Sequence, residues 1–289
     1  MKVVVAGNCQ ARPMARLLSQ LNPEITITAT PIVHLLQPAD EAVFRPALDE
    51  ADLIITQLIA DSYPCEFIRT NRLKERYGDK VKTILNLYFT GYNPDLRYLR
   101  HPQVGTLRGP LSDYHNKTIL TGWMLGIAQQ QVVKWLNDPF YNQREYALAS
   151  QASLAELKKR EELVDVPIVD CIEAGYKHQR FFFTFNHPSA ALLAQYAHRV
   201  NAMLLGNTAE IHNEMIKNEF LDQLIPKIPP GLGHEQAAQA VSKGQEVLSV
   251  NGAKIELGAE KNYTDEELVA LFYQIYTDNA DFIREKYDT

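Results

Sequence analysis

A cysteine lies directly after a short apolar segment near the start of the chain. Residues 3–6 are Val-Val-Val-Ala, and a glycine, Asn8 and Cys9 follow them. Residues 12–21 have the composition of a helix, so Cys9 is expected at the amino end of that helix. Unpaired N–H groups and the helix dipole at that end favour a thiolate, and Arg12 adds positive charge. Cys9 is therefore a candidate nucleophile; the alternative is a small buried residue that fills a turn.

Two histidines are candidates for general acid–base catalysis. His187 precedes Pro188, which suits the first position of a helix, and it follows an expected strand. His115 lies at the end of a long irregular segment, where Asp113 could orient its ring. For both residues the alternative is a surface or capping histidine with no chemical role.

Amide and basic side chains complete the set of candidates. Gln10 and Gln57 could donate N–H groups to an oxyanion, or they could cap backbone groups at strand ends. The irregular segment over residues 88–116 has a local positive balance that suits a pyrophosphate or a 3′-phosphate. Its basic residues are Arg97, Arg100, His101 and Arg108.

Alternating strands and helices must position these residues. Strands are expected at residues 3–6, 25–29, 52–57 and 81–87, with helices at 12–21 and 64–77. This alternation predicts an α/β fold: a mostly parallel sheet flanked by helices. Ligands bind beyond the carboxyl ends of parallel strands. If the strand expected at 180–185 is also parallel, Cys9, His187 and several amides meet at one edge of the sheet.

The second half of the chain is expected to be mostly helical. Helices are predicted at 117–136, 143–163 and 188–205, and a capping box at residues 264–267 opens another that extends to about 287. Residues 167–171 are expected to form a strand, and residues 225–233 (IPKIPPGLG) a linker. We therefore predict an α/β domain over residues 1–207 and a mainly helical C-terminal extension over residues 208–289.

Composition excludes several classes of protein. In 289 residues, 46% hydrophobic and 22% charged side chains are typical of a globular protein rather than a disordered one. The net charge of −6 argues against a nucleic-acid partner, which requires a basic face. Three cysteines without zinc-ligand spacing predict no metal site and a reducing cytoplasm. No apolar run is long enough for a signal peptide or a membrane span.

Five short motifs, taken in order and spacing, resemble the WcbI family of capsular polysaccharide biosynthesis proteins. The resemblance extends from residue 1 to about residue 205. The motifs are Gly7-Asn8-Cys9-Gln10, Thr56-Gln57, the YFTGYNPD segment at 88–95, Asp113-Tyr114-His115, and the FNHP segment at 185–188. Members of that family are regarded as acetyltransferases that bind coenzyme A.

The resemblance implies a coenzyme A or acetyl-CoA site and a sugar or nucleotide-sugar acceptor. Its candidate cofactor-binding residues are Asn8, Gln10, Arg12, Gln57, Tyr88, Tyr92, Arg108 and Asn186. The first motif is also distantly similar to the GDS block of SGNH-type esterases and acetyltransferases, with Cys9 at the nucleophile and His187 at the base. Thr184 stands where the acid of that triad would fall, and no GxND block is present. A Cys–His dyad is therefore the most that this similarity implies.

Three functions follow as hypotheses. The first is acetyl transfer from acetyl-CoA to a sugar hydroxyl. In it either Cys9 carries the acetyl group, or His187, or else His115, activates the hydroxyl for direct attack. The second is an SGNH-like carbohydrate esterase, which would hydrolyse simple esters without coenzyme A. The third is a non-catalytic component that binds coenzyme A or sugar. The acceptor sugar and the oligomeric state are not specified by the sequence.

Overall fold

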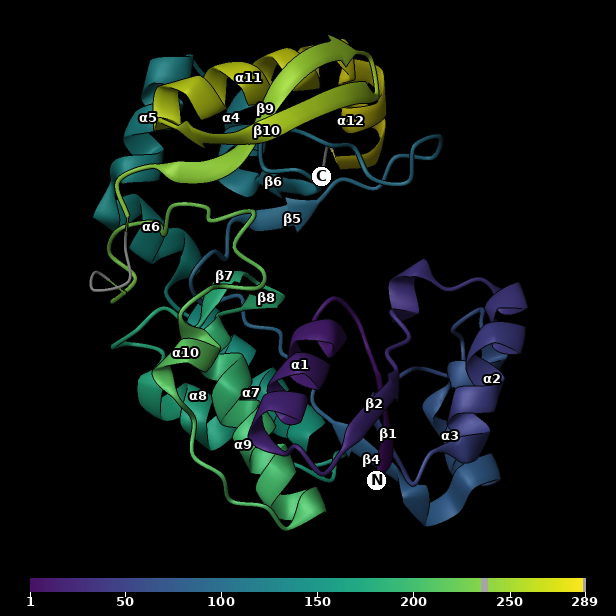
Figure 1. Ribbon diagram of the computed structural model, residues 1–289. Coiled ribbons are helices and arrows are strands. Elements are labelled where there is room, and N and C mark those ends of the chain that lie inside the picture. The colour runs from purple at the N-terminus through teal and green to yellow at the C-terminus, as the bar shows by residue number, and fades with distance from the viewer. Residues whose placement is uncertain (235–238, 288–289) are drawn as a thin grey trace. The chain divides into compact units, whose positions relative to one another are not determined.

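The computed structural model describes residues 1–234 and 239–287, which form two compact units (Figure 1). Unit 1 contains Met1–Tyr88, Leu154–Gly175 and His187–Phe220. Unit 2 contains Phe89–Ser153, Tyr176–Asn186 and the described residues from Leu221 onward. The two units are thus interleaved along the chain, whereas the sequence predicted one boundary at residue 207.

A four-stranded parallel sheet forms the centre of unit 1, which confirms the α/β prediction. Its strands are β1 (Lys2–Ala6), β2 (Thr26–Ala29), β3 (Leu53–Gln57) and β4 (Val81–Ile84), in the order β2-β1-β3-β4. Val3, Val4, Val5 and Ala6 are completely buried. A run buried on both faces is the pattern that parallel sheets require, because helices cover both sides.

Helices lie on both sides of this sheet (Figure 1). The helices that lie wholly in unit 1 are α1 (Ala11–Leu21), α2 (Glu41–Glu50), α3 (Thr70–Tyr77), α8 (Val169–Gly175), α9 (Ala190–Leu205) and α10 (Asn213–Ile216). Short 3₁₀ turns add Val33–Leu35, Pro38–Asp40, Glu66–Ile68 and Gly78–Lys80. Helix α1 packs on α9, where Leu17, Leu18, Leu193 and Ala197 are fully buried. This packing fixes the start of α1, and with it the turn that carries Cys9.

Unit 2 consists of helices, a long hairpin and a second pair of short strands. Its helices are α4 (Lys117–Met124), α5 (Gln129–Asn137), α6 (Pro139–Tyr146), α11 (Asp265–Asp278) and α12 (Ala280–Tyr287); α7 (Ala149–Glu161) starts in unit 2 and continues in unit 1. Strands β9 (Ser242–Asn251) and β10 (Lys254–Tyr263) form the hairpin, and β5 (Leu96–Tyr98) pairs with β6 (Tyr114–Asn116). Strand β7 is Phe182–Thr184; β8, His187–Pro188, belongs to unit 1. The core of unit 2 forms around Phe272 and Tyr276 of α11.

Several predicted elements are wrong. The helix expected at 117–136 is broken after α4, where Gly126 has a φ of 67°. The helix expected at 143–163 is divided between α6 and α7. Residues 167–171 are not a strand, because the Glu161 carboxylate accepts the N–H groups of Ile168 and Val169 and so caps α8.

Two further corrections concern the second half of the chain. Strand β7 does not join the parallel sheet, so the strand before His187 is not its fifth member. The extension predicted to be mainly helical contains the β9–β10 hairpin, whose alternating residues escaped the sequence prediction. The segment expected to be a linker packs within unit 2, where the Pro226 carbonyl accepts a hydrogen bond from Arg180 at 2.7 Å. The capping box is confirmed: Thr264 and Glu267 bond each other's backbone N–H.

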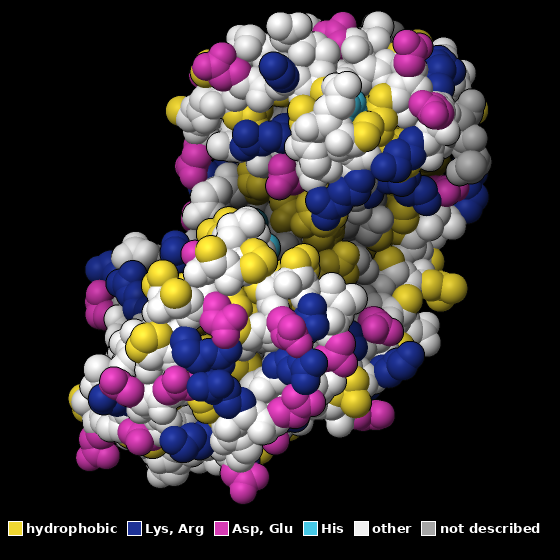
Figure 2. Space-filling view, turned by 90° about the vertical axis from the view of Figure 1, so that its right-hand side faces the viewer, with side chains coloured by type: hydrophobic (Ala, Val, Ile, Leu, Met, Phe, Trp, Pro, Cys, Tyr) yellow, Lys and Arg dark blue, Asp and Glu magenta, His cyan; other side chains and the backbone are white. Residues whose placement is uncertain are grey.

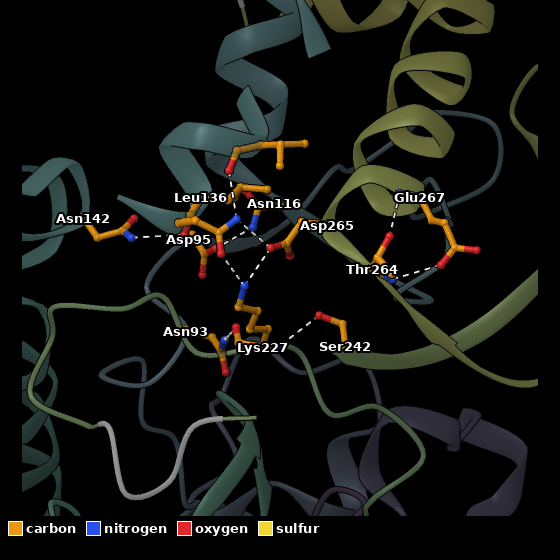
Figure 3. Close-up of polar contacts among 12 residues, drawn as sticks. Asn93, Asp95, Asn116, Leu136, Asn142, Lys227, Ser242, Thr264, Asp265 and Glu267 are labelled. Atoms are coloured by element: carbon orange, nitrogen blue, oxygen red, sulfur yellow. Dashed lines mark hydrogen bonds and ion pairs between the residues drawn. The ribbon is translucent and has the colours of Figure 1, made fainter. Parts of the chain in front are cut away.

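A partly buried polar cluster joins that segment to the rest of unit 2 (Figure 3). Lys227 Nζ donates to Asp265 at 2.7 Å and to Asn137 at 2.6 Å. Beside them, Asn116 donates to one carboxylate oxygen of Asp95, while the other, Oδ1, has no hydrogen-bond partner among the described residues. Burial therefore raises the pKa of Asp95 to about 7, and the nearby Asp265 charge acts in the same direction.

This raised pKa makes the stability of unit 2 depend on pH. Folded Asp95 keeps its proton up to about pH 7, whereas in the unfolded chain this carboxyl has its ordinary pKa of 3.8 and releases the proton there. The free energy of unfolding therefore falls by about 4 kcal/mol as the pH rises through this window. Asp95→Asn cannot ionise, so we expect its stability relative to wild type to improve by that amount between pH 4 and pH 8.

Urea unfolding at each pH, followed by tryptophan fluorescence, measures this effect. Both tryptophans, Trp123 and Trp135, lie in unit 2, so the signal reports that unit. The matched control is the exposed Asp281→Asn on α12. A difference between Asp95→Asn and wild type that is constant with pH would show that Asp95 ionises normally in the fold.

Candidate functional site

The carboxyl ends of three neighbouring strands bring the predicted polar residues of unit 1 together. The turn after β1 contributes Asn8, Cys9 and Gln10, while Gln57 ends β3 and Asn86 follows β4. We call this group the sheet-edge turn. The strand order β1-β3-β4 places these three strand ends side by side. This confirms the prediction that the polar residues following these strands meet at one edge of the sheet.

Two glutamines connect the three strand ends. Gln10, only 2% exposed, donates from Nε2 to the Leu87 carbonyl at 2.7 Å, and its Oε1 accepts the Leu87 N–H at 3.1 Å. Gln57 Nε2 donates to the same Gln10 oxygen at 3.0 Å, and Gln57 Oε1 accepts the Asn8 N–H at 2.9 Å. These bonds use both side-chain oxygens within the protein. Both amides were candidate oxyanion donors; in this structure they hold the turn that carries Cys9.

Asn8 fixes the turn from the other side. Its Oδ1 accepts the backbone N–H of Gln10 at 2.9 Å, and its Nδ2 donates to Asn86 Oδ1 at 3.0 Å. An asparagine side chain that bonds the backbone two residues ahead is a common way to close a turn before a helix. The orientation of Cys9 is therefore determined by neighbours on both sides.

Gly7 is required for the close approach of Gln57. A Cβ built on Gly7 would lie 2.7 Å from Gln57 Oε1 and 2.8 Å from Gln57 Cδ. We therefore expect Gly7→Ala to displace the Gln57 amide and break its bond to Asn8, with a cost of about 2 kcal/mol. Hydrogen exchange of the β1 and β3 amides measures that cost locally.

A double mutant separates the clash from other effects of the added methyl group. Because Gln57→Ala removes the atoms that the new Cβ would meet, adding Gly7→Ala to Gln57→Ala should cost almost nothing. If Gly7→Ala costs the same in both backgrounds, the Gln57 side chain does not constrain position 7.

Cys9 is half-buried, and its environment opposes ionisation. Burial raises the pKa of the thiol to about 11, although hydrogen bonding by the backbone at Cys9 and Gln10 acts in the opposite direction. The helix start alone predicts a lowered pKa, but desolvation of the thiolate is the larger effect here. Arg12 is exposed and is not among the groups that shift this pKa. Cys9 is thus a protonated thiol at neutral pH in the free protein.

Arg160 is a member of the site that the sequence did not reveal. Its guanidinium donates to the Asn86 carbonyl at 3.0 Å, so α7 brings a positive charge to the sheet-edge turn. Within the sequence Arg160 stands in a Lys-Lys-Arg-Glu-Glu run, which is typical of a solvent-exposed helix face. Only the packing of the second half of α7 within unit 1 distinguishes Arg160 from its neighbours in that run.

His187 lies in β8, also within unit 1, and is half-buried. Burial lowers the pKa of its imidazole to about 4, so the ring is neutral at pH 7. A neutral imidazole is the form that can accept a proton. The expected helix starts later, at Ala190, with Ser189 as its N-cap residue.

Two other candidate residues are core residues of unit 2. His115 is completely buried, its ring nitrogens lie 2.9 Å from the Leu107 carbonyl and 3.2 Å from the Tyr276 hydroxyl, and burial lowers its pKa to about 4. Tyr92 is 1% exposed, and its hydroxyl bonds the Tyr176 carbonyl at 2.6 Å. The roles predicted for His115 in proton transfer and for Tyr92 in cofactor binding are therefore incompatible with their burial in this unit.

The remaining candidates have different environments. Tyr88 in unit 1 is 37% exposed. In unit 2, Arg108 Nε lies 3.8 Å from Asp113 Oδ1. Also in unit 2, Asn186 Oδ1 accepts hydrogen bonds from the Tyr114 hydroxyl at 2.6 Å and from the Thr184 hydroxyl at 3.1 Å. The Thr184 hydroxyl thus helps to hold the Asn186 side chain in place.

Of the basic residues of the irregular segment in unit 2, Arg100 and Arg108 are exposed, Arg97 is partly buried and His101 is buried. Arg97 lies 4.8 Å from the centre of the Tyr287 ring, and Lys286 donates to the Arg100 carbonyl at 2.6 Å. Figure 2 shows a row of Lys and Arg side chains on this unit, in the upper part of the view. The predicted local positive balance is therefore present.

Comparison with known proteins identifies the family. The family model described as "Polysaccharide biosynthesis enzyme WcbI" matches residues 2–208. The chain belongs to the WcbI family. Comparison with curated proteins gave no match. A solved WcbI structure matches with a TM-score of 0.65 and 17% identity, over 98% of this chain and 97% of that one. At this identity the match shows a shared fold.

The WcbI fold thus extends over both units. The solved WcbI protein is described as a native form without a disulfide bond between coenzyme A and one of its cysteines. Within residues 1–234 and 239–287, no three His, Cys, Asp or Glu side chains are grouped to hold a metal ion. No helix in the described part of the chain is long and apolar enough to span a membrane.

Proposed function

We propose that this WcbI protein transfers an acetyl group from acetyl-CoA to a hydroxyl of a sugar or nucleotide-sugar acceptor. The observation that supports this proposal is a single thiol, Cys9, at the carboxyl edge of a parallel sheet, where α/β proteins bind their ligands. The related solved protein, in which a cysteine and coenzyme A are described together, supports the choice of thioester. We infer that the pantetheine end of coenzyme A binds at the sheet-edge turn.

We take direct transfer, rather than a covalent acetyl-cysteine, as the mechanism to test, because the Cys9 thiol is protonated in the free protein. Removing the proton from a thiol with a pKa of about 11 costs about 5 kcal/mol at pH 7. The imidazole of His187 is neutral at pH 7, but with a pKa of about 4 it is too weak a base to remove the hydroxyl proton beforehand. It accepts that proton while the hydroxyl oxygen attacks the thioester carbonyl; the C–S bond then breaks, and the proton passes to the departing thiolate of coenzyme A.

In this mechanism the backbone N–H of Cys9 stabilises the developing oxyanion, since the N–H groups of Asn8 and Gln10 and the two glutamine side chains are engaged in holding the turn. Cys9 lines the thioester site and can form a mixed disulfide with coenzyme A when an oxidant is present. Arg160 contributes positive charge at the same edge.

Thermal unfolding with coenzyme A, acetyl-CoA and dephospho-CoA tests the proposal. We expect coenzyme A and acetyl-CoA to raise the melting temperature, because a ligand that binds only the folded state stabilises it. Transfer of radiolabelled acetyl groups to capsular sugars should be abolished in His187→Ala and reduced but measurable in Cys9→Ala. Intact mass after exposure to acetyl-CoA should show no acetyl adduct. An adduct on Cys9 would replace direct transfer with a covalent route, and no thermal shift would remove the coenzyme A site.

A further inference from the structure

An open hollow of about 670 Å³ lies among α4, α5 and α6 of unit 2. These three helices are consecutive in the chain, and Figure 1 shows α5 and α6 along one side of the unit. The volume is within the range of about 300–1,000 Å³ that is usual for ligand pockets. Lining residues that matter here are Leu125, Gln131, Trp135, Phe140, Tyr141 and Arg144. We call this feature the α4–α6 hollow.

The wall of the hollow contains a stacked pair of aromatic rings. Trp135 and Tyr141 are stacked, with ring centres 5.4 Å apart and planes 3° from parallel. The Arg144 guanidinium lies 5.3 Å from the centre of the Tyr141 ring. The indole N–H of Trp135 donates no hydrogen bond to any residue that the structure describes. The wall thus combines apolar ring surface with an available donor.

Two large apolar side chains of the hollow are exposed. Phe140 is 82% exposed and Leu125 is 67% exposed. A monomeric protein gains nothing in stability from such exposure, and clustered apolar side chains with polar neighbours are typical of a binding surface. Aromatic and aliphatic surface interspersed with amide, carboxylate and guanidinium groups matches a sugar ring, which has C–H groups on its faces and hydroxyl groups on its edges.

The charges of the hollow restrict the kind of sugar. Arg144 is paired with Glu145 at 3.0 Å, and Asp138 adds a negative charge while capping α6 through the Phe140 N–H at 2.9 Å. The lining therefore has one positive and two negative side chains. A nucleoside diphosphate or a uronate chain would meet net repulsion here, whereas an uncharged glycan would not.

We propose that the α4–α6 hollow is a binding site for an uncharged stretch of a glycan chain, held by stacking on Trp135 and Phe140 and by hydrogen bonds to Gln131 and Arg144. The inference rests on the proposed function in one respect: the glycan is taken to be the acceptor chain. The family assignment to polysaccharide biosynthesis agrees with this class of ligand.

Titration of the full chain with neutral hexasaccharides, followed by intrinsic fluorescence, tests the proposal. The probes are maltohexaose, laminarihexaose and mannohexaose, with hexagalacturonate as the charged comparison, each up to about 10 mM. At least one neutral probe should change the emission of Trp135, and hexagalacturonate should not. Trp123, the other tryptophan, is 8% exposed and bonded to Thr277, so it is not expected to respond.

Variants locate the binding. Trp135 packs partly against the core, so Trp135→Phe should remove the fluorescence change while preserving the fold. Phe140→Ala and Arg144→Ala alter exposed side chains and should each weaken binding about tenfold by calorimetry. The matched control is Leu148→Ala, which is 72% exposed but does not line the hollow and should bind like wild type.

The outcomes separate this proposal from the proposed function. A thermal shift with coenzyme A in the absence of any response to the neutral hexasaccharides would overturn the glycan site alone. Glycan binding without a coenzyme A shift would overturn the acetyltransferase proposal alone. If Phe140→Ala instead changes the oligomeric mass measured by light scattering, the hollow is an interface between copies of the chain, and the glycan site is wrong.

Discussion

The rate at which iodoacetamide alkylates Cys9 should increase about a thousandfold between pH 7 and pH 10. Only the thiolate reacts, and burial raises the pKa of this thiol to about 11. The thiolate fraction therefore grows about tenfold with each pH unit over that whole range, without a plateau. At pH 7 the folded protein should react about a hundredfold more slowly than the same cysteine in urea, because burial raises the pKa by about two units from 9.0.

Peptide mass spectrometry after timed alkylation distinguishes Cys9 from the other two cysteines. Cys65 is 1% exposed and serves as an unreactive internal reference. Arg12→Ala is the matched control for the charge argument; since Arg12 does not shift this pKa, the profile should not change. A plateau near pH 8 in wild type would mean that the helix start outweighs burial, and the covalent route would then regain support.

Gln10→Ala should destabilise unit 1 by about 3–5 kcal/mol. The substitution removes three hydrogen bonds and leaves both backbone groups of Leu87, which is 1% exposed, without their partner. Each buried polar group that loses its partner costs about 1–3 kcal/mol. Hydrogen exchange of the β1, β3 and β4 amides measures the loss within unit 1.

A residue of the same type provides the control for this prediction. Gln20 lies on the exposed face of α1, the helix whose N-cap residue is Gln10. Gln20→Ala should therefore change the free energy of unfolding by less than about 0.5 kcal/mol. Gln10→Ala and Gln57→Ala should also be non-additive, because they share one hydrogen bond. If the losses in free energy of unfolding add up in the double mutant, and Gln10→Ala alone has a small effect, the two glutamines do not hold the turn together.

The sequence determined the four strands of the parallel sheet, the first helix and the motif that identifies the family. Runs such as Val3-Val4-Val5 predict strands because full burial on two faces demands apolar residues throughout. The convergence of Asn8, Gln57 and Asn86 also followed from the sequence, because parallel strands end at one edge. The order of the motifs then led to the WcbI family.

Tertiary structure decided which of these residues have freedom to react. The sequence alone does not distinguish His115 from His187 as a catalytic base. In the structure His115 packs against Tyr276 and belongs to the core of unit 2. Arg160 joins the site because α7 packs there, and its charged neighbours in sequence conceal that role. The thiol of Cys9 has the opposite ionisation to that expected from its place at a helix start. The cost of burying its charge depends on surrounding atoms that are distant in the chain, and local sequence does not contain that information.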